Sequence, residues 1–297
     1  MSNQRTPQVI SVSRRTDIPA FYTEWFLHRI RAGYARYRNP FGGQNYEISL
    51  KPDDVMAFVF WSRNYGPLLP YLSDLDQPGY GGYFHFTLTG FGKPLEPHAP
   101  SVQDILDIFK ALAERYSPKH VLWRFDPIIL SNKIPAEEIT AKFESLARQL
   151  RGYTERCYTS FVDFYHKTER NLHSLADQGF RFYDPATEEK IALIRQLVEI
   201  GNTYAIRVYA CCESDLLTVP GVTQAHCVDA ALIAELFPDK FRELKKTPTR
   251  EGCGCFASRD IGAYDTCIYG CCYCYANASH QKALTNYKRH DPANPAL

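Results

Sequence analysis

Three cysteines near the end of the chain have a spacing that suits metal chemistry. Cys267, Cys271 and Cys274 form a C-x3-C-x2-C pattern, in which Gly270 precedes the second cysteine and Tyr273 precedes the third. Three thiolates can bind three irons of a [4Fe–4S] cluster and leave the fourth iron open to another ligand. A cluster that is only structural, or that only transfers electrons, normally takes four thiolates. The pattern therefore predicts an iron–sulfur cluster that takes part in chemistry.

Zinc is the alternative occupant of such cysteines. C-x-C and C-x2-C pairs, both present in this chain, can build a tetrahedral site of four thiolates. The three-residue gap after Cys267, together with Gly270 and Tyr273, favours the iron–sulfur interpretation. Cys272 falls between two of the predicted ligands, so we expect its side chain to point away from them.

The other cysteines indicate a second metal centre. Of the ten cysteines, only Cys157 lies in the first 210 residues, whereas cysteines placed only for core packing would be spread more evenly. We expect an auxiliary cluster or a structural zinc site formed by Cys253 and Cys255 with two of Cys211, Cys212 and Cys227, of which Cys212 and Cys227 are preferred. Alternatively, these thiols bind no metal.

Composition and charge limit the possible partners. The chain has 297 residues and a net charge of +1, so no overall field directs it to nucleic acid or to a membrane surface. No apolar run approaches the roughly 18 residues that span a bilayer, and Met1–Pro7 is polar, unlike a signal peptide. We therefore expect a cytoplasmic protein. In such reducing surroundings clustered cysteines bind metal or act in catalysis more often than they pair as disulfides.

Short β-rich runs alternate with longer helical patterns, which is typical of parallel βαβ units. The predicted strands are Val9–Ser13, Val55–Trp61, Tyr83–Thr89, His120–Phe125, Cys157–Phe161 and Tyr204–Tyr209. The predicted helices are Ala20–Ala32, Val102–Tyr116 after a Ser101 cap, Ala136–Leu150, Glu188–Ile200 ended by Gly201, and Val228–Phe237. Tyr34–Ser49 is predicted to form a hairpin around residues 39–43.

These elements predict an α/β fold, specifically a partial or closed β/α barrel of about six parallel strands. Residues 1–239 would form the barrel. Residues 240–297 would form a cysteine-rich segment that carries the cluster and packs on the barrel mouth.

In parallel α/β folds the active site lies at the carboxyl ends of the strands, and those positions are polar here. We expect them to line one cavity, in which an arginine can bind the carboxylate of a ligand. The catalytic candidates are Arg14, Asp17, Arg124 and Asp126, and the cofactor-binding candidates are Thr87, Thr89, Arg63, Asp163 and Tyr273. Alternatively, Arg14, Arg15 and Asp17 form salt bridges that only close the barrel mouth. An isolated histidine such as His85 is expected to be structural.

Several segments resemble one bacterial family across nearly the whole chain. They are residues 10–22 (ISVSRRTDIPAFY), 60–64 (FWSRN), 124–128 (RFDPI) and the cysteine-rich terminal stretch, which contains residues 260–264 (DIGAY). In these motifs the chain resembles the domain of unknown function 1848 family. That family label assigns no activity. It implies a C-terminal cysteine cluster like that of radical S-adenosylmethionine enzymes, and hence a cofactor but no substrate.

The three-cysteine loop also resembles the cluster loop of radical S-adenosylmethionine enzymes themselves. Their loop follows the first barrel strand, whereas this one lies close to the end of the chain. Either the barrel is circularly permuted or the tail folds back over its mouth. A Gly-Gly-Glu-like strand motif, which often binds the methionine amino group, is not found in the sequence.

The resemblance implies a radical S-adenosylmethionine enzyme with a [4Fe–4S] cluster, S-adenosylmethionine as cosubstrate and a ferredoxin or flavodoxin as reductant. The substrate, a small molecule or a macromolecule, stays unknown. The Cys-x2-Cys-Tyr ending also resembles the loop of spore photoproduct lyase, but the near-neutral charge does not favour a nucleic-acid substrate. The alternative function is a zinc- or iron–sulfur-binding regulatory or nucleic-acid-binding module without radical chemistry.

Overall fold

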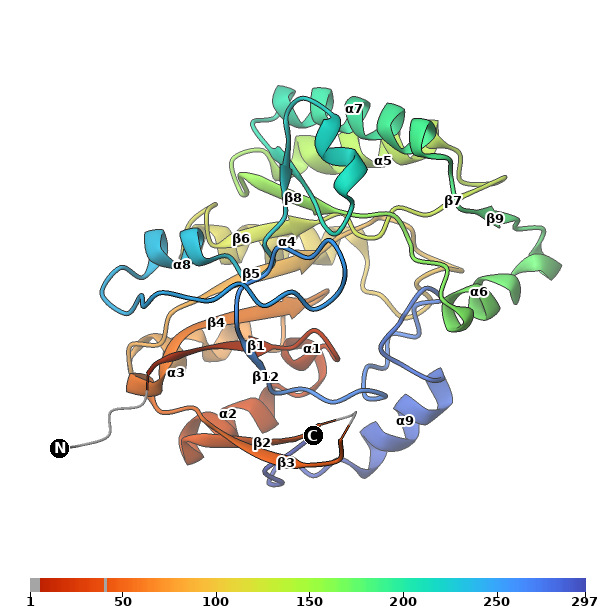
Figure 1. The fold of residues 1–297 in the computed structure, drawn as a ribbon. Helices are drawn as coiled ribbons and strands as arrows, with labels where there is room; N and C mark the ends of the chain where they lie inside the picture. The colour runs from red at the N-terminus through yellow and green to blue at the C-terminus, as the bar shows by residue number, and fades with distance from the viewer. Residues whose placement is uncertain (1–5, 40–41) are drawn as a thin grey trace.

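A parallel sheet forms the centre of the molecule. The computed structural model describes residues 6–39 and 42–297, and its eight-stranded sheet has the order β11-β10-β8-β6-β5-β4-β1-β12 (Figure 1). All neighbouring strands are parallel, so their carboxyl ends lie at one edge. The strands are β1 (Gln8–Val12), β4 (Val55–Ser62), β5 (Gly82–Thr87), β6 (Val121–Arg124), β8 (Arg156–Thr159), β10 (Arg207–Ala210), β11 (Val222–Gln224) and β12 (Arg259–Asp260).

The predicted parallel α/β fold is confirmed, and the six predicted strands correspond to β1, β4, β5, β6, β8 and β10. The strand predicted from Tyr204 begins too early, because the chain turns at Ala205, whose φ is 59°. Two short strands that the sequence did not predict, β11 and β12, form the edges of the sheet. They do not pair with each other in the described part of the chain. The sheet is therefore open there, and closure into a barrel is not seen.

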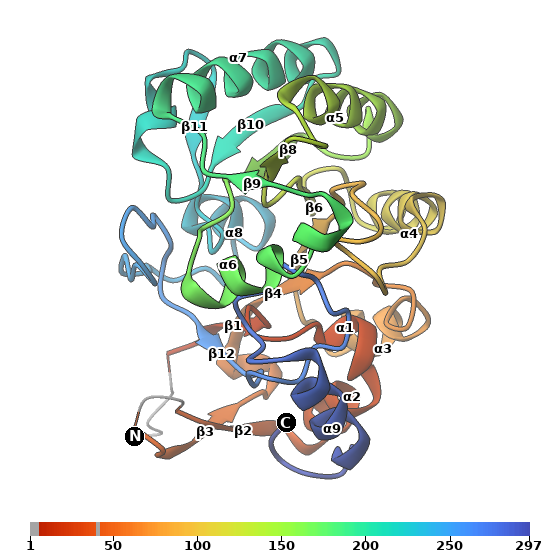
Figure 2. The ribbon, with the colours of Figure 1, turned by 90° about the vertical axis from the view of Figure 1, so that its right-hand side faces the viewer.

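Several helices stand side by side on one face of this sheet (Figure 2), whereas α8 (Ala230–Leu236) packs on the other. The five predicted helices are present. The one over Ala136–Leu150 has the predicted ends, the other four have shifted ends, and the first is divided at Tyr22. The helices are α1 (Ile18–Phe21), α2 (Thr23–Ala32), α3 (Leu72–Asp76), α4 (Val102–Arg115), α5 (Ala136–Leu150), α6 (His166–His173), α7 (Thr187–Thr203), α8 (Ala230–Leu236) and α9 (His280–Arg289).

Both faces of the sheet carry an apolar core. Alternate strand residues point to opposite faces, so Phe84 and Phe86 of β5 pack into the larger core with the helices, whereas Tyr83 packs into a smaller core with residues of α8. Burying a Phe side chain stabilises the fold by roughly 1.5–3 kcal/mol. The smaller core also contains Cys227 and Cys255. These two thiols therefore lie on the α8 face of the sheet.

The C-terminal segment joins the main sheet. In β12, Arg259 pairs with Ile10 of β1 and Asp260 pairs with Ser11. Further along, α9 returns to the start of the chain, where the rings of Tyr287 and Tyr22 are 5.6 Å apart. The division of the chain at residue 240 stays a prediction, but the segment beyond it shares a sheet with the first strand.

Two small antiparallel pairs lie outside the main sheet. The predicted hairpin is formed by β2 (Tyr34–Arg38) and β3 (Asn45–Ser49), and residues 40–41 of its predicted turn lie outside the described residues. The second pair joins β7 (Leu130–Ser131) to β9 (Phe182–Tyr183). Both pairs extend the connections between the larger elements.

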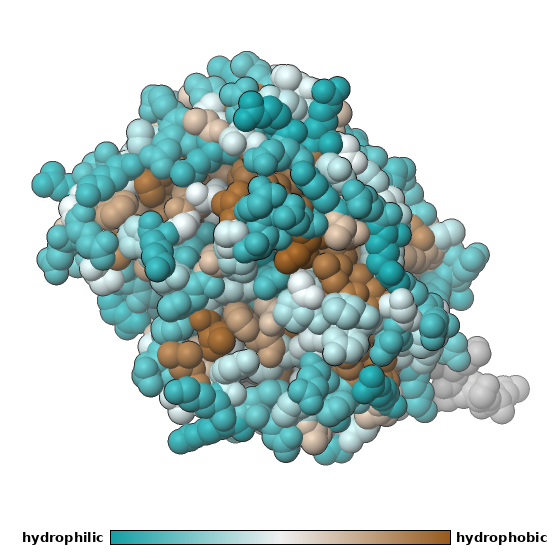
Figure 3. Space-filling view, turned by 180° about the vertical axis from the view of Figure 1, so that it is seen from behind, coloured by the Kyte–Doolittle hydropathy of each residue, from teal (hydrophilic) through white to brown (hydrophobic). Residues whose placement is uncertain are grey.

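The helices present polar side chains to solvent. In α4, Ile105, Phe109 and Leu112 share one buried side, as a period of 3.6 residues predicts. Ser101 caps this helix by accepting a hydrogen bond from the amide of Asp104. The surface seen from behind is largely hydrophilic, with small hydrophobic patches (Figure 3). Within residues 6–39 and 42–297, each helix is too short or too polar to cross a bilayer.

Gly201 does not end α7, contrary to the sequence prediction. The helix continues to Thr203, and Gly201 lies in its last turn. A Cβ atom on Gly201 would lie 2.4 Å from the backbone oxygen of Ile206. The amide of Ile206 also donates a hydrogen bond to the Gly201 carbonyl at 2.8 Å. Glycine is therefore required by the close approach of the chain that leads into β10.

We expect Gly201→Ala to lower the free energy of unfolding by about 1–3 kcal/mol, because the added methyl group collides with backbone that β10 holds in place. Asn202→Ala, at the exposed neighbouring position, is the matched control and should change stability by less than about 0.5 kcal/mol. Chemical denaturation measures both. Equal stability of wild type and Gly201→Ala would show that the close approach imposes no constraint.

Candidate functional site

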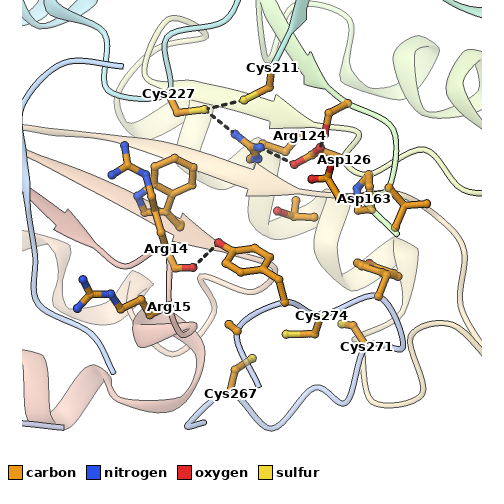
Figure 4. Close-up of a pocket in the computed structure, with 18 of the residues that line it drawn as sticks. Arg14, Arg15, Arg124, Asp126, Asp163, Cys211, Cys227, Cys267, Cys271 and Cys274 are labelled. Atoms are coloured by element: carbon orange, nitrogen blue, oxygen red, sulfur yellow. Dashed lines mark hydrogen bonds and ion pairs between the residues drawn. The ribbon is translucent and has the colours of Figure 1, made fainter. Parts of the chain in front are cut away.

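One cavity of about 380 Å³ lies at the carboxyl ends of the strands, a volume typical of small-molecule sites. Residues that follow β1, β4, β6 and β10 line it, together with parts of the C-terminal segment from Thr249 to Ala276. Figure 4 shows Cys267, Cys271 and Cys274 at its lower wall and Cys211 with Cys227 at its upper wall. Two groups of cysteines thus face one cavity.

The predicted cluster loop forms the lower wall. Gly270 has a φ of 68°, a left-handed value that glycine adopts without strain. Cys272 points away from the cavity, as predicted, and its thiol donates to the carbonyl of Pro94 at 3.4 Å. Among the residues that the structure describes, no three His, Cys, Asp or Glu side chains meet closely enough to hold a single metal ion. In a four-iron cluster each thiolate binds a different iron. Its ligands therefore lie further apart than the ligands of a single metal ion.

Hydrogen bonds from three directions hold this loop in place. The hydroxyl of Tyr22 donates to the Thr266 carbonyl at 2.7 Å. The side-chain amide of Asn277 donates to the Cys267 carbonyl at 2.6 Å. The amide of Cys272 donates to the Leu95 carbonyl at 2.9 Å. The loop backbone is therefore fixed against the junction of α1 and α2, against the chain after β5 and against its own continuation.

Burial raises the pKa of the three loop thiols. For Cys271 the pKa rises to about 12, although the nearby Arg63 guanidinium acts in the opposite direction. Burial is also the main cause of the raised pKa of Cys267 and of Cys274. A buried thiolate needs a compensating positive charge, and a bound metal supplies one. An all-thiol donor set in a buried wall fits an iron–sulfur cluster.

Three polar atoms of the residues that line the cavity are buried without a partner among the described residues, namely Nη2 of Arg14 and the hydroxyls of Thr16 and Tyr269. Buried polar groups normally make hydrogen bonds. All three therefore have unused hydrogen-bonding capacity. A guanidinium N–H is a suitable donor to a carboxylate, so these atoms fit a cosubstrate with an amino-acid end.

Arg63 and Tyr273, two predicted cofactor-binding residues, share a buried carboxylate. Arg63 Nη2 lies 2.8 Å from Glu96 Oε1, and the Tyr273 hydroxyl donates to the same oxygen. Thr89 is not among the residues that line the cavity; its hydroxyl donates to Glu96 at 2.6 Å. No sequence pattern pointed to Glu96, because it lies in a long connection with no motif around it. Its contacts with Arg63, Tyr273 and Thr89 connect it to the site.

Asp17 lines the cavity as an anchored carboxylate. Its Oδ1 accepts hydrogen bonds from the Ser62 hydroxyl at 2.6 Å and from the Ala20 amide at 3.0 Å. Its Oδ2 accepts from the Arg63 amide at 2.8 Å. Burial raises the pKa of Asp17 to about 6, against the effect of these donors. These contacts give Asp17 a positioning role between α1 and the end of β4, and its catalytic role stays a prediction.

Arg14 is held by its backbone and by an aromatic ring. Its amide donates to Asp260 Oδ2 at 2.8 Å, and its carbonyl accepts from the Tyr275 hydroxyl at 2.6 Å. Its guanidinium lies 5.0 Å from the centre of the Trp61 ring, a cation–π distance. The salt bridges of Arg14, Arg15 and Asp17 that were the alternative expectation are not found among the described residues; Arg15 Nη1 instead donates to the Gly262 carbonyl at 3.3 Å.

Arg124 and Asp126 form an ion pair after β6. The Ser160 hydroxyl donates to the other oxygen of Asp126, and Arg124 Nη1 donates to Cys227 Sγ at 3.3 Å. Thr87, at the end of β5, lines the same cavity. This network connects the strand ends to the upper wall.

Asp163, a predicted cofactor-binding residue, lies at the exposed rim of the cavity and pairs with Arg250. Arg250 also donates to the Tyr165 hydroxyl at 3.5 Å. The sequence analysis assigned Arg250 no role, because it ends a polar, basic stretch that looks like any solvated link. Its partner shows that this stretch reaches the cavity.

Five further cysteines line the cavity at and near its upper wall. Cys211 and Cys212 follow β10, Cys227 follows β11, and Cys253 with Cys255 precede β12. The sulfurs of Cys211 and Cys227 are 3.4 Å apart. The structure thus brings together the four cysteines predicted for a second centre, and Cys211 with them.

His85 is fully buried next to these cysteines. Its Nε2 lies 2.7 Å from the Cys227 carbonyl oxygen, and its ring stacks on Trp61 at 4.3 Å. Burial lowers the pKa of His85 to about 3, and the charge of Arg124 acts in the same direction. A neutral imidazole that donates to the Cys227 carbonyl is a structural histidine, as the sequence analysis expected.

A family model for a domain of unknown function (DUF1848) matches residues 9–276. The chain belongs to this family. Its description names no activity, so membership supports the shared motifs of the strand ends and the cysteine segment without assigning a reaction. No curated protein matches the sequence.

The solved structures that resemble this chain do so remotely. A D-hydantoinase has a TM-score of 0.32 and 10% identity over 80% of this chain and 45% of its own. The dihydropyrimidinase from Brevibacillus agri NCHU1002 has the same TM-score and coverage with 9% identity. The L-hydantoinase (dihydropyrimidinase) from Arthrobacter aurescens has a TM-score of 0.28 and 8% identity over 69% of this chain and 41% of its own. The chain spans less than half the length of these proteins, and likeness at this level says nothing about its activity.

We expect Glu96→Gln to lower the free energy of unfolding by about 3–5 kcal/mol, because it leaves the buried Arg63 cation without a counter-charge. The two side chains are 10% and 4% exposed. Glu47→Gln, which breaks the exposed pair with Arg36, is the matched control and should cost less than about 1 kcal/mol. Urea denaturation measures both. Equal losses would mean that the Arg63–Glu96 pair is no more important than a surface pair.

We expect the stability of the wild type to fall by about 2 kcal/mol more than that of His85→Gln between pH 6.5 and pH 5. The pKa of His85 is about 3 in the fold and about 6.5 in the unfolded chain. Over this pH range only the unfolded wild type takes up a proton at this position, so acid favours unfolding. The stability that His85 contributes is complete above pH 6.5 and is lost towards pH 3. Parallel pH profiles of the two proteins, measured by urea denaturation, would contradict a neutral buried His85.

Proposed function

We propose that this chain is a radical S-adenosylmethionine enzyme. The observation that carries the proposal is that Cys267, Cys271 and Cys274 line the same cavity as the polar strand ends. Their C-x3-C-x2-C spacing and the resemblance of the loop support a [4Fe–4S] cluster with an open iron. The position of the cavity supports catalysis, because parallel α/β enzymes carry their active sites at this edge of the sheet.

Residues on two sides of the cavity would hold the cofactors. The thiolates of Cys267, Cys271 and Cys274 would hold the cluster. Nη2 of Arg14 and the hydroxyl of Tyr269, both free and buried, would bind the polar end of S-adenosylmethionine. The chemistry that such a cluster would supply is one-electron reductive cleavage of the sulfonium of S-adenosylmethionine. A ferredoxin- or flavodoxin-type protein would be the external reductant.

The residues of the chain would position the reactants and exclude water. Glu96 fixes Arg63 and Tyr273 beside the cluster loop. The centre of the Trp61 ring lies 5.0 Å from the guanidinium of Arg14 and 5.2 Å from that of Arg124. One aromatic ring therefore stabilises the positions of two cations. Aromatic and aliphatic surface next to these cations lowers the local dielectric, which strengthens their interaction with a charged ligand.

The path of the C-terminal segment supports one explanation for the late position of the loop. After β12 pairs with β1, the chain supplies residues 267–276 to the cavity at the strand ends. This path favours a tail that folds back over the cavity. A cytoplasmic location and an unknown substrate, small or macromolecular, complete the proposal.

The direct test compares wild type with Cys271→Ala after anaerobic reconstitution with iron and sulfide. We expect the reduced wild type to release 5′-deoxyadenosine, or another fragment of the cosubstrate, and Cys271→Ala to form no more than the reaction without protein. Cys272→Ala is the matched control, because that thiol points to Pro94, and should keep the wild-type rate. Product release by Cys271→Ala equal to that of the wild type would place the chemistry elsewhere.

A further inference from the structure

The five cysteines at the upper wall, Cys211, Cys212, Cys227, Cys253 and Cys255, form a continuous set of sulfur contacts; we refer to them as the five-cysteine group. Cys211 and Cys227 are 3.4 Å apart. The Cys253 side chain forms hydrogen bonds with those of Cys212 and Cys255, and the Cys255 amide donates to Cys253 Sγ at 3.4 Å. The Cys227 side chain likewise forms hydrogen bonds with those of Cys211 and Cys255. Every member therefore interacts with at least one other, although the group comes from three separate segments.

The backbone that brings these cysteines together is strained. Cys212 has a φ of 61°, a left-handed conformation that destabilises a residue with a side chain and is concentrated at functional sites. Gly252 has a φ of 69°, and a Cβ atom there would lie 3.3 Å from the backbone of Cys212. The chain before β12 thus lies in close contact with the residues that follow β10. The strained Cys212 and this close contact occur where Cys253 and Cys255 meet Cys212 and Cys227.

Positive charge lies beside the group. Arg124 Nη1 donates to Cys227 Sγ at 3.3 Å, and the Arg14 guanidinium interacts electrostatically with Cys255 and Cys227. Cys211, Cys227 and Cys255 are buried. Buried thiolates are stable only with such partners or with a metal. Two guanidinium groups also suit a metal centre whose four thiolates give it a net negative charge.

We propose that the five-cysteine group is a second metal site, which binds zinc or an iron–sulfur cluster through four thiolates. Thiolates select these soft centres, and four of them complete either a structural zinc site or a cluster without an open iron. In the described residues no three donors surround one point. Binding therefore removes thiol protons and rotates the side chains about χ1. The proposal is independent of the proposed function, because it concerns other cysteines.

The site connects two parts of the fold around the cavity. Cys253 and Cys255 belong to the chain that enters β12, whereas Cys212 and Cys227 belong to the loops after β10 and β11. A metal bound by both pairs would join the two ends of the sheet across the cavity. It would also fix Arg250, which lies in the same segment and pairs with Asp163. Metal at this site is therefore structural, in contrast to the cluster of the three-cysteine loop.

The test removes the cluster loop and looks for metal that stays bound. We expect the triple variant Cys267→Ala/Cys271→Ala/Cys274→Ala, purified anaerobically, to retain about one metal centre per chain with sulfur ligands. Elemental analysis with X-ray absorption spectroscopy measures the metal and its ligands and distinguishes zinc from an iron–sulfur cluster. Adding Cys253→Ser/Cys255→Ser to this variant should remove the metal, whereas adding Cys157→Ala should not, because Cys157 is a residue of β8 whose side chain is buried in the larger core.

A triple variant that contains no metal would overturn the proposal, and so would a quintuple variant that keeps it. If the quintuple variant does not fold, the metal content and sulfur ligation of the triple variant decide the question. None of these measurements requires enzymatic activity. The second site can therefore fail while the proposed function stands, or the reverse.

Discussion

Asp260 holds the beginning of the chain to its end, and the arrangement of the cavity depends on this contact. Its carboxylate accepts hydrogen bonds from the Ser11 hydroxyl at 2.8 Å and the Ser13 hydroxyl at 2.6 Å. It also accepts one from the Arg14 amide at 2.8 Å. β12 lies in the chain between the five-cysteine group and the three-cysteine loop. Fixing β12 beside β1 therefore brings both groups to the carboxyl ends of the strands.

Buried cations and thiols meet on both walls of the cavity. Arg63 lies near Cys271 on the lower wall and Arg124 donates to Cys227 on the upper wall. Each arginine also has its own carboxylate, so neither is an uncompensated charge. In a buried environment such interactions are stronger than in water, and an unpaired thiolate is costly. The wall is thus suited to hold negatively charged metal–thiolate centres between fixed positive groups.

The strand series could be predicted because buried parallel strands are continuous apolar runs, of which Val55–Trp61 is a clear example. β11 and β12 were missed because strands of three and two residues have no measurable periodicity. The openness of the sheet could not be predicted, because sequence spacing counts strands but does not give their curvature or the pairing of their edges. Gly201 was wrongly predicted to end its helix for a related reason. Glycine is required there by the close approach of Ile206, which the helix pattern does not reveal.

The site residues that could be predicted from the sequence are those that the strands of the parallel sheet place at its carboxyl edge. Arg14, Arg63 and Arg124 lie at or within two residues of the carboxyl ends of β1, β4 and β6, so they had to meet at one edge of the parallel sheet. Glu96 and Arg250 were not predictable, because long connections place them and no local pattern marks them. Thr89 was assigned to the cavity since it lies near the end of β5, but its side chain binds Glu96. The convergence of cysteines from three segments likewise became clear only in the fold.

The central claim is that the three-cysteine loop holds a [4Fe–4S] cluster whose open iron binds S-adenosylmethionine. Electron paramagnetic resonance of the reduced, anaerobically reconstituted protein, recorded with and without S-adenosylmethionine, tests it most directly. We predict a four-iron signal that changes shape when S-adenosylmethionine is added, and no signal that responds to S-adenosylmethionine when Cys267, Cys271 and Cys274 are replaced together. A protein that binds only zinc, or a signal that S-adenosylmethionine leaves unchanged, would contradict the claim.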